Sequence, residues 1–224
     1  MPLLRKFRYI AFFDLDMTLL SVNSANIFVR ESLNRNMMTR EQVRYAYWLS
    51  LLHKLDWKDT GIIIRRLLGW LEGLRVPEVE MMCEEVFNES LKDFLRPGVL
   101  HEIDLHRQQD AAIVLLSSAT TFACSPVAKY LNMDDVICSR IEEQNGLLKG
   151  HTSGKLVFGP EKKYRLLSYC ETEGYNPYEA YYYGDSISDL HVLEAVGNPV
   201  CVYPDKKLRR IAVRRGWRIF DQPY

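Results

Sequence analysis

The chain has 224 residues, which is more than one small domain needs and less than two full domains occupy, so we expect a core domain with a smaller insertion. Hydrophobic residues make up 47% and charged residues 26% of the chain, values that exclude a collagen-like or disordered protein. Lysine and arginine together number 29, as do aspartate and glutamate, so net charge attracts the molecule neither to nucleic acid nor to anionic lipid.

The five cysteines are odd in number and widely spaced, without a C-x-x-C pair. This spacing argues against structural zinc and a disulfide framework, and it favours buried free thiols in a reducing compartment. Asp14 and Asp16 interrupt the first apolar run, which does not fit a signal peptide, and no run of 18 apolar residues predicts a membrane span. We therefore expect a cytoplasmic protein without an integral membrane segment.

The first apolar run, residues 9–13, predicts a buried strand that ends at Asp14. Residues 23–94 carry apolar side chains at helical spacing, with Asp59 and Pro77 as helix-start signals. Beyond residue 96, helices and strands alternate. We predict a helix ending near 108 and helices at 122–131, 161–173 and 205–215. The predicted strands are at 111–116, near 136, at 180–183 and at 199–203, with a further helix between the last two. A hairpin is predicted at 140–149 and a closing segment at 217–220.

Strands that alternate with helices pair in parallel, because each helix returns the chain across one face of the sheet. We therefore predict an α/β fold with a doubly wound, mainly parallel sheet. The core domain would comprise residues 1–22 and 95–224. Residues 23–94 would form a helical cap inserted after the first strand.

Residues 14–18, with the sequence DLDMT, directly follow the first predicted strand. Two carboxylates two residues apart in a turn can face one small site, where one attacks a substrate and the other transfers a proton. The alternative is an acidic turn that caps the next helix.

Residues 184–189, with the sequence GDSISD, follow another apolar run. Carboxylates four residues apart can meet on one face where a helix begins, and they suit a hard cation such as Mg²⁺. The alternative is a helix N-cap by Asp185 with a solvated Asp189.

Two further segments lie between these acidic pairs. Residues 117–120 (SSAT) place hydroxyls and backbone N–H groups after a predicted strand, an arrangement typical of anion binding, although a serine-rich helix cap reads equally well. Lys162 begins a helix and could neutralise phosphate charge, although a surface lysine is the simpler interpretation. Ligands of open α/β sheets bind outside the carboxyl ends of the strands, so the four segments predict one site.

In this order, the four segments resemble those of the haloacid dehalogenase-like superfamily of phosphohydrolases. The interval from Lys162 to Asp185, together with the helical insertion, is most similar to the phosphoserine-phosphatase-like branch of that superfamily. The resemblance spans essentially the whole chain. It implies a Mg²⁺-dependent phosphatase that hydrolyses a small-molecule phosphate monoester.

The resemblance also implies residue roles. Asp14 would be the nucleophile that becomes an aspartyl-phosphate, and Asp16 would protonate the leaving alcohol and later activate water. The carboxylates of Asp14 and Asp185 and the backbone carbonyl of Asp16 would hold Mg²⁺.

Ser118 and Lys162 would bind the phosphoryl oxygens, and Lys162 would also position the nucleophile. Ser117 and Lys163 are the register alternatives. Asp189 would orient Lys162 or the waters around the metal ion.

Two positions depart from the family pattern. Met17 is bulkier than the residue that commonly occupies its place. Asn23 stands where phosphoserine phosphatases of this branch carry an acidic residue that binds the substrate amine, and a neutral amide does not supply that charge pairing. Phosphatases for phospholipid-derived or amino-alcohol phosphates, phosphotransfer to another acceptor and a non-catalytic, phosphate-accepting switch remain the alternatives.

Two other groups of side chains are assigned structural roles. The helical spacing of the insertion aromatics Tyr45, Tyr47, Trp48, Trp57 and Trp70 predicts that most of them form the core of the cap. Arg65 and Arg66 lie among them. The basic residues between 206 and 218 predict the solvated face of a final helix whose apolar side is Leu208, Ile211 and Val213.

Overall fold

The computed structural model describes residues 7–54 and 66–221. Within them, six strands form one sheet in the order β3-β2-β1-β6-β7-β8, and every neighbouring pair is parallel. The strands are β1 (Tyr9–Phe13), β2 (Ala111–Thr120), β3 (Asp135–Ser139), β6 (Tyr181–Gly184), β7 (Asn198–Val202) and β8 (Arg218–Phe220). The predicted doubly wound, parallel α/β sheet is confirmed.

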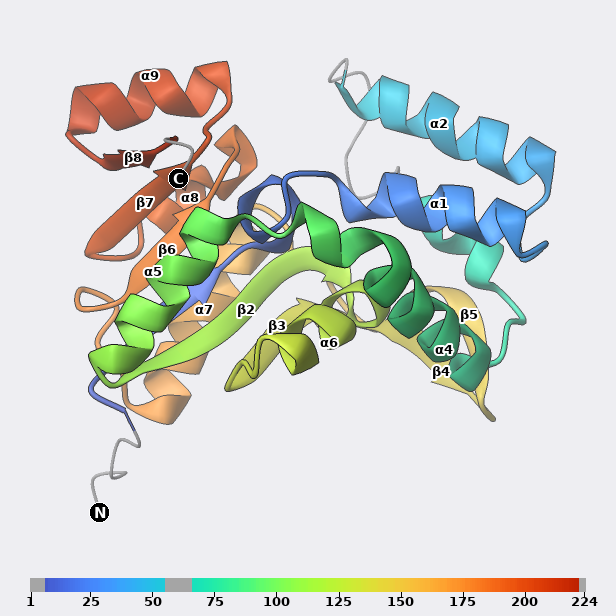
Figure 1. Cartoon of the computed structure of the whole chain (residues 1–224), viewed down its shortest axis with the longest axis horizontal. Helices are drawn as coiled ribbons and strands as arrows, with labels where there is room; N and C mark the ends of the chain where they lie inside the picture. The colour runs from blue at the N-terminus through green and yellow to red at the C-terminus, as the bar shows by residue number, and fades with distance from the viewer. Residues whose placement is uncertain (1–6, 55–65, 222–224) are drawn as a thin grey trace.

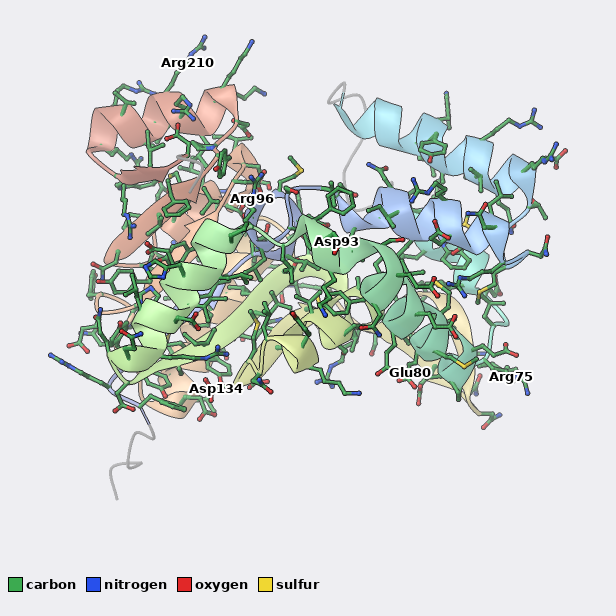
Figure 2. All side chains as sticks on the ribbon, in the orientation of Figure 1. Arg75, Glu80, Asp93, Arg96, Asp134 and Arg210 are labelled. Carbon is green, nitrogen blue, oxygen red and sulfur yellow. The ribbon has the colours of Figure 1, made fainter. Side chains whose placement is uncertain are left out.

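Helices cover both faces of the sheet because successive side chains of each buried strand point to opposite sides. Ala11 and Phe13 of β1 pack with α5 (Pro97–Gln108) and α6 (Thr121–Tyr130). Ile10 and Phe12 pack on the other side. There they meet α7 (Pro160–Glu173), α8 (Leu190–Leu193) and α9 (Lys206–Arg215). Figure 1 shows α5 in front of the sheet and α7 behind it.

Where it is described, the segment between β1 and α5 consists of helices joined by short loops, and it begins with the helical turn η1 (Leu15–Leu19). Its helices are α1 (Ser24–Asn34), α2 (Arg40–Lys54) and α4 (Val76–Val86), with short helical turns at η2 (Gly69–Leu71), η3 (Phe87–Leu91) and η4 (Lys92–Phe94). Pro77 lies in the first turn of α4, as predicted. The predicted helix start at Asp59 and the side chains of Trp57 and Arg65 lie outside the described residues. In Figure 1 this helical group lies on the side of the molecule away from α9.

The predicted burial of the cap aromatics is wrong for α2. Tyr45, Tyr47 and Trp48 are exposed, whereas Trp70 is partly buried. The reason is that α2 packs along one narrow stripe. Over residues 40–49, where burial is described, its buried residues are Val43, Ala46 and Leu49, spaced three apart, and the aromatic residues lie beside that stripe.

Besides the packing of α4 on α6, backbone hydrogen bonds join the helical segment to the core at three places in the described part of the chain. Where the chain leaves and re-enters the core, Ser21 N–H donates to the Phe94 carbonyl at 2.8 Å and Arg96 N–H donates to the Leu19 carbonyl at 2.9 Å. The third place is the antiparallel hairpin of β4 (Ile141–Gln144) and β5 (Leu147–Thr152), which has the predicted turn at residues 145–146. Leu148 of this hairpin exchanges backbone hydrogen bonds with residues 73 and 74 of the helical segment, each at 2.9 Å.

The end of one predicted strand and the apolar side of the last predicted helix need correction. Strand β2 continues to Thr120 instead of ending at Leu116, because after a register shift its pairing with β3 resumes at Thr120 and Ser139. On α9 the buried residues are Leu208 and Ala212, whereas Val213 is 68% exposed.

The cysteines behave largely as predicted. All five are free thiols; Cys138 is half-buried and the others are buried. None of the helices in the described part of the chain is long and apolar enough to span a membrane.

Candidate active site

The predicted site residues converge where β1 and β6 end. Asp14 directly follows β1 and Asp185 directly follows β6, so the two neighbouring strands deliver both carboxylates to one edge of the sheet. Lys162, in the first turn of α7, approaches the same point. So does Asp189, the last residue of the short helical turn η5 (Ile187–Asp189). Asp14, Lys162 and Asp189 are buried, and Asp185 is half-buried.

Lys162 connects the two acidic segments. Its Nζ lies 2.9 Å from Asp14 Oδ1 and 2.8 Å from Asp189 Oδ1, and its side chain is only 2% exposed. Burial disfavours the charged ammonium, but the two carboxylates outweigh that cost and raise the pKa of Lys162. The surface-lysine interpretation is therefore wrong. The register alternative Lys163 is half-buried and forms no ion pair within the described residues.

The donor set fits a divalent cation. Asp14, Asp185 and Asp189 each offer a carboxylate oxygen, and these oxygens lie within 4.8 Å of one another. Within the described residues, Asp189 Oδ2 is buried and receives no hydrogen bond. Burial and the neighbouring carboxylates raise the pKa of Asp14 to about 6 and that of Asp185 to about 8, because three carboxylates crowd beside a single ammonium group. A cation bound between them would relieve this repulsion. Hard oxygen ligands of this kind suit Mg²⁺.

This cluster differs from the predicted metal ligands in one respect. The predicted set used the backbone carbonyl of Asp16 beside the carboxylates of Asp14 and Asp185. The structure adds the carboxylate of Asp189 to the same small volume. Asp189 is 2% exposed, so the alternative in which it is a solvated residue is wrong.

A residue of the helical insertion forms a hydrogen bond with the Asp16 side chain. The Ser24 backbone N–H, at the start of α1, donates to Asp16 Oδ1 at 2.7 Å. Burial raises the pKa of Asp16, although the Ser24 hydrogen bonds oppose this shift. The carboxyl group therefore has a fixed orientation and an enhanced tendency to carry a proton. Neither Asp14 nor Asp185 caps a helix with its side chain, whereas Asp205 caps α9.

Ser117 and Ser118 differ in availability. Ser117 is buried, and its hydroxyl accepts the Ala119 N–H at 3.3 Å. Ser118 is half-buried and its carbonyl accepts the Ser139 hydroxyl at 3.1 Å, which fixes the backbone without engaging the Ser118 hydroxyl. Of the two register alternatives, Ser118 has the hydroxyl that remains available to a ligand.

Sequence reasoning missed Tyr182. Its hydroxyl donates to Asp189 Oδ1 at 2.8 Å. Strand alternation was the available signal, because Tyr182 shares a face of β6 with Gly184, at the entry to the second acidic segment.

Both the sequence and the fold match known proteins. A sequence profile of the haloacid dehalogenase-like hydrolases matches residues 11–194. Phosphoserine phosphatase SerB1 of Mycobacterium tuberculosis is 29% identical over 215 residues, which cover 94% of this chain and 70% of that protein.

Two solved structures share the fold. A protein of unknown function from Bordetella pertussis Tohama I matches with a TM-score of 0.88 at 24% identity, over 96% of this chain and 99% of that one. A phospho-aspartyl intermediate analogue of phosphoserine phosphatase matches with a TM-score of 0.73 at 16% identity, over 97% and 95% of the two chains. The chain thus belongs to the haloacid dehalogenase-like hydrolases, and within them it is an enzyme that resembles the phosphoserine-phosphatase-like branch.

Proposed function

We propose that this hydrolase is a Mg²⁺-dependent phosphatase that cleaves a small-molecule phosphate monoester through an aspartyl-phosphate on Asp14. The observation that carries the proposal is the buried Lys162, which contacts Asp14 and Asp189 within a cluster of three carboxylates. A buried lysine in such contact orients a nucleophile and adds positive charge where a phosphate binds.

In the first half-reaction, a carboxylate oxygen of Asp14 attacks phosphorus and the bond from phosphorus to the alcohol oxygen breaks. Asp16 donates its proton to the departing alcohol, and its raised pKa favours the protonated form that this step needs. In the second half-reaction, Asp16 accepts a proton from the water that attacks the aspartyl-phosphate. The bond from phosphorus to the Asp14 oxygen then breaks, which releases inorganic phosphate and restores both residues.

Mg²⁺ held by Asp14, Asp185 and the Asp16 carbonyl would offset the repulsion between an anionic nucleophile and an anionic phosphate. Lys162 neutralises part of the same charge, and its contact with Asp14 Oδ1 orients the nucleophile. The Ser118 hydroxyl would hydrogen-bond a phosphoryl oxygen. Asp189 orients Lys162 from the opposite side.

The substrate's alcohol portion would meet the start of α1. Asn23 is exposed at the N-cap of α1, directly before the Ser24 N–H that binds Asp16, and its side chain forms no capping hydrogen bond. An amide at this place accepts a hydrogen bond but gives no charge pairing to an ammonium group. We therefore propose that the preferred substrate does not depend on an amine, although the relative SerB1 is named for phosphoserine.

The test is phosphate release from a panel of phosphate monoesters with Mg²⁺, with a chelator, and with the Asp14→Asn variant. We expect metal-dependent turnover that chelation and Asp14→Asn both abolish. Asp93→Asn, which removes an exposed carboxylate from η4, is the matched control and should keep full activity. Turnover that survives Asp14→Asn would overturn the aspartyl-phosphate.

A second variant addresses the substrate. Asn23→Glu restores a carboxylate at the proposed leaving-group position. We expect this variant to raise kcat/KM for phosphoserine relative to an amine-free phosphate such as glycerol phosphate. An unchanged ratio would show that Asn23 does not contact the alcohol portion.

A further inference from the structure

The strand β6 directs two neighbouring tyrosines to opposite faces of the sheet. Tyr182 packs with the α7 side of the core and Tyr183 with the α5 side. Both side chains are fully buried, and both hydroxyls are hydrogen-bonded. The Tyr183 hydroxyl donates to Glu102 of α5, on the other face of the sheet, whereas the Tyr182 hydroxyl donates to Asp189 of the carboxylate cluster.

Asp189 Oδ1 therefore accepts two hydrogen bonds. The Tyr182 hydroxyl and Lys162 Nζ each lie 2.8 Å from this oxygen. The second oxygen, Oδ2, is buried and receives no donor within the described residues. The two donors thus occupy Oδ1, whereas Oδ2 remains available to bind a cation.

Two donors on one oxygen fix the plane of the carboxylate. The terminal torsion of aspartate is soft, so a single contact to Lys162 would leave Asp189 free to turn. The side chains of Tyr182 and Asp189 both lie against Gly184, since a Cβ there would meet Tyr182 Cε1 at 2.7 Å and Asp189 Oδ2 at 2.8 Å. Glycine at 184 lets the phenol ring and the carboxylate pack against the strand backbone at this point.

We propose that Tyr182 is a positioning residue whose hydroxyl fixes Asp189, and through Asp189 both the ammonium of Lys162 and the carboxylate cluster that holds the cation. The phenol touches neither substrate nor metal ion. It acts by keeping Lys162 directed at Asp14 and by keeping the Asp189 carboxylate in the cluster with Asp14 and Asp185. This inference rests on the proposed phosphatase function for its kinetic part, and on the carboxylate cluster alone for its metal-binding part.

The test removes one oxygen atom. Tyr182→Phe keeps the ring that packs on Gly184 and deletes only the donor. Tyr183→Phe is the matched control, because it deletes an equally buried, hydrogen-bonded hydroxyl from the next residue of the same strand, on the face away from the cluster. Tyr182→Phe removes the contact with Asp189, and Tyr183→Phe removes the contacts with Glu102 and His106, so the control should lose at least as much stability in urea unfolding.

We expect the two variants to separate in function. Tyr182→Phe should lower kcat for p-nitrophenyl phosphate by about tenfold with KM changed less than about twofold, because substrate contacts are untouched. It should also weaken Mg²⁺ binding to the free enzyme, measured by calorimetry, by at least about threefold. Tyr183→Phe should change kcat and the Mg²⁺ dissociation constant by less than about twofold.

A double-mutant cycle tests whether Tyr182 acts through Asp189. In an Asp189→Asn background, Tyr182→Phe should cost less than about twofold in kcat, since the group that it positions has already changed. Multiplicative losses would overturn the proposal, and so would equal losses in Tyr182→Phe and Tyr183→Phe or a Tyr182→Phe enzyme with normal kcat and Mg²⁺ affinity.

Failure of the proposed phosphatase function can be distinguished from failure of the positioning role of Tyr182. If the wild-type enzyme releases no phosphate from any monoester, that proposal fails. The calorimetric comparison of Tyr182→Phe with Tyr183→Phe still supports or overturns the positioning role.

Discussion

Gly184 occupies a position without room for a side chain. A Cβ there would lie 2.7 Å from the ring of Tyr182 and 2.8 Å from Asp189 Oδ2, closer than non-bonded atoms approach. The residue joins β6 to the second acidic segment, so a displacement at Gly184 moves Asp185 as well as Asp189. The packing around Gly184 and the positions of Asp185 and Asp189 therefore both depend on the absence of a side chain at residue 184.

We predict that Gly184→Ala lowers stability by about 1–3 kcal/mol, because it overpacks the interior, and lowers kcat by at least about tenfold. Gly69→Ala is the control, since a Cβ at Gly69 meets no atom within 4 Å. That variant should stay within about 0.5 kcal/mol of the wild type with unchanged kcat. Urea unfolding measures the stability of both variants, and phosphatase assays measure their kcat. A fully active Gly184→Ala enzyme would contradict the tight contact.

The backbone conformation of Met17 explains why a small residue is common at this position in the family. Its φ angle is 59°, in the left-handed region where a side chain costs about 1–2 kcal/mol. The residue lies between Asp16 and Thr18 in the turn that follows β1. The strain therefore lies in the loop that carries the proposed nucleophile and proton donor.

We predict that Met17→Gly is more stable than Met17→Ala by about 0.5–1 kcal/mol. Both variants remove the exposed side chain, but only glycine relieves the left-handed backbone. Urea unfolding of the two variants under one set of conditions measures the difference. Equal stability, or a more stable alanine variant, would show that the turn stores no such strain.

At the scale of elements, a buried polar network ties α5 to three strands. The Tyr183 hydroxyl of β6 donates to Glu102 at 2.7 Å, and the two nitrogens of His106 lie 2.8 Å from the hydroxyls of Tyr9 and Tyr183. Arg218 of β8 donates twice to Glu102, each time at 2.7 Å. The network braces β6 from the face opposite the carboxylate cluster.

His106 makes this network sensitive to pH. Burial is the main cause that lowers the pKa of His106 to about 4 from its usual 6.5. Between these values the unfolded chain binds a proton that the folded chain does not, so stability is full above pH 6.5 and falls as pH decreases toward 4. The contribution is at most about 1.4 kcal/mol per pH unit.

The measurement is the free energy of unfolding from pH 7 to 4.5 for wild type and His106→Gln. Glutamine does not titrate, so the variant should lose less stability over this range than the wild type. His191→Gln, at an exposed histidine, should keep the wild-type pH dependence. Parallel curves for wild type and His106→Gln would contradict the assignment.

The elements and the main site residues follow from the sequence, because strand ends and helix starts are local signals. Asp14 and Asp185 stand at strand ends, and the rule for open sheets is enough to bring them together. Lys162 begins a helix, and its role in the site is implied by the family resemblance. The contact of Tyr182 with Asp189 depends on side-chain direction within a strand whose register is set by its neighbours. Burial on α2 likewise depends on which stripe meets α1, which helical spacing alone leaves open. The extension of β2 to Thr120 arises from pairing with β3, an interaction between distant segments.

At the scale of the whole molecule, a cap confined to residues 23–94 does not describe every contact of the helical segment. The hairpin of β4 and β5 belongs to the core by sequence, yet Gly73 N–H donates to the Leu148 carbonyl and Leu148 N–H to the Leu74 carbonyl. Any movement of the cap relative to the sheet must therefore carry the hairpin along or break these hydrogen bonds. We propose that the hairpin moves with the cap, as part of one unit.

Gly150 offers a way to break that unit selectively. A Cβ at Gly150 would lie 3.0 Å from Glu72 Cβ and 3.2 Å from the Gly69 carbonyl oxygen, so Gly150→Ala pushes the hairpin away from the helical segment. Gly154→Ala is matched in strain, because both glycines have left-handed φ angles, +67° and +83°, but a Cβ at Gly154 meets no atom within 4 Å.

We predict that Gly150→Ala speeds amide hydrogen exchange at Gly73 and Leu148 together by about tenfold or more, since weakening the contact by about 1.4 kcal/mol raises local opening by that factor. Gly154→Ala should leave both amides at their wild-type rates. If both variants exchange alike at these two amides, or if Gly73 and Leu148 respond independently of each other, the hairpin and the helical segment open separately. The cap would then move without the hairpin.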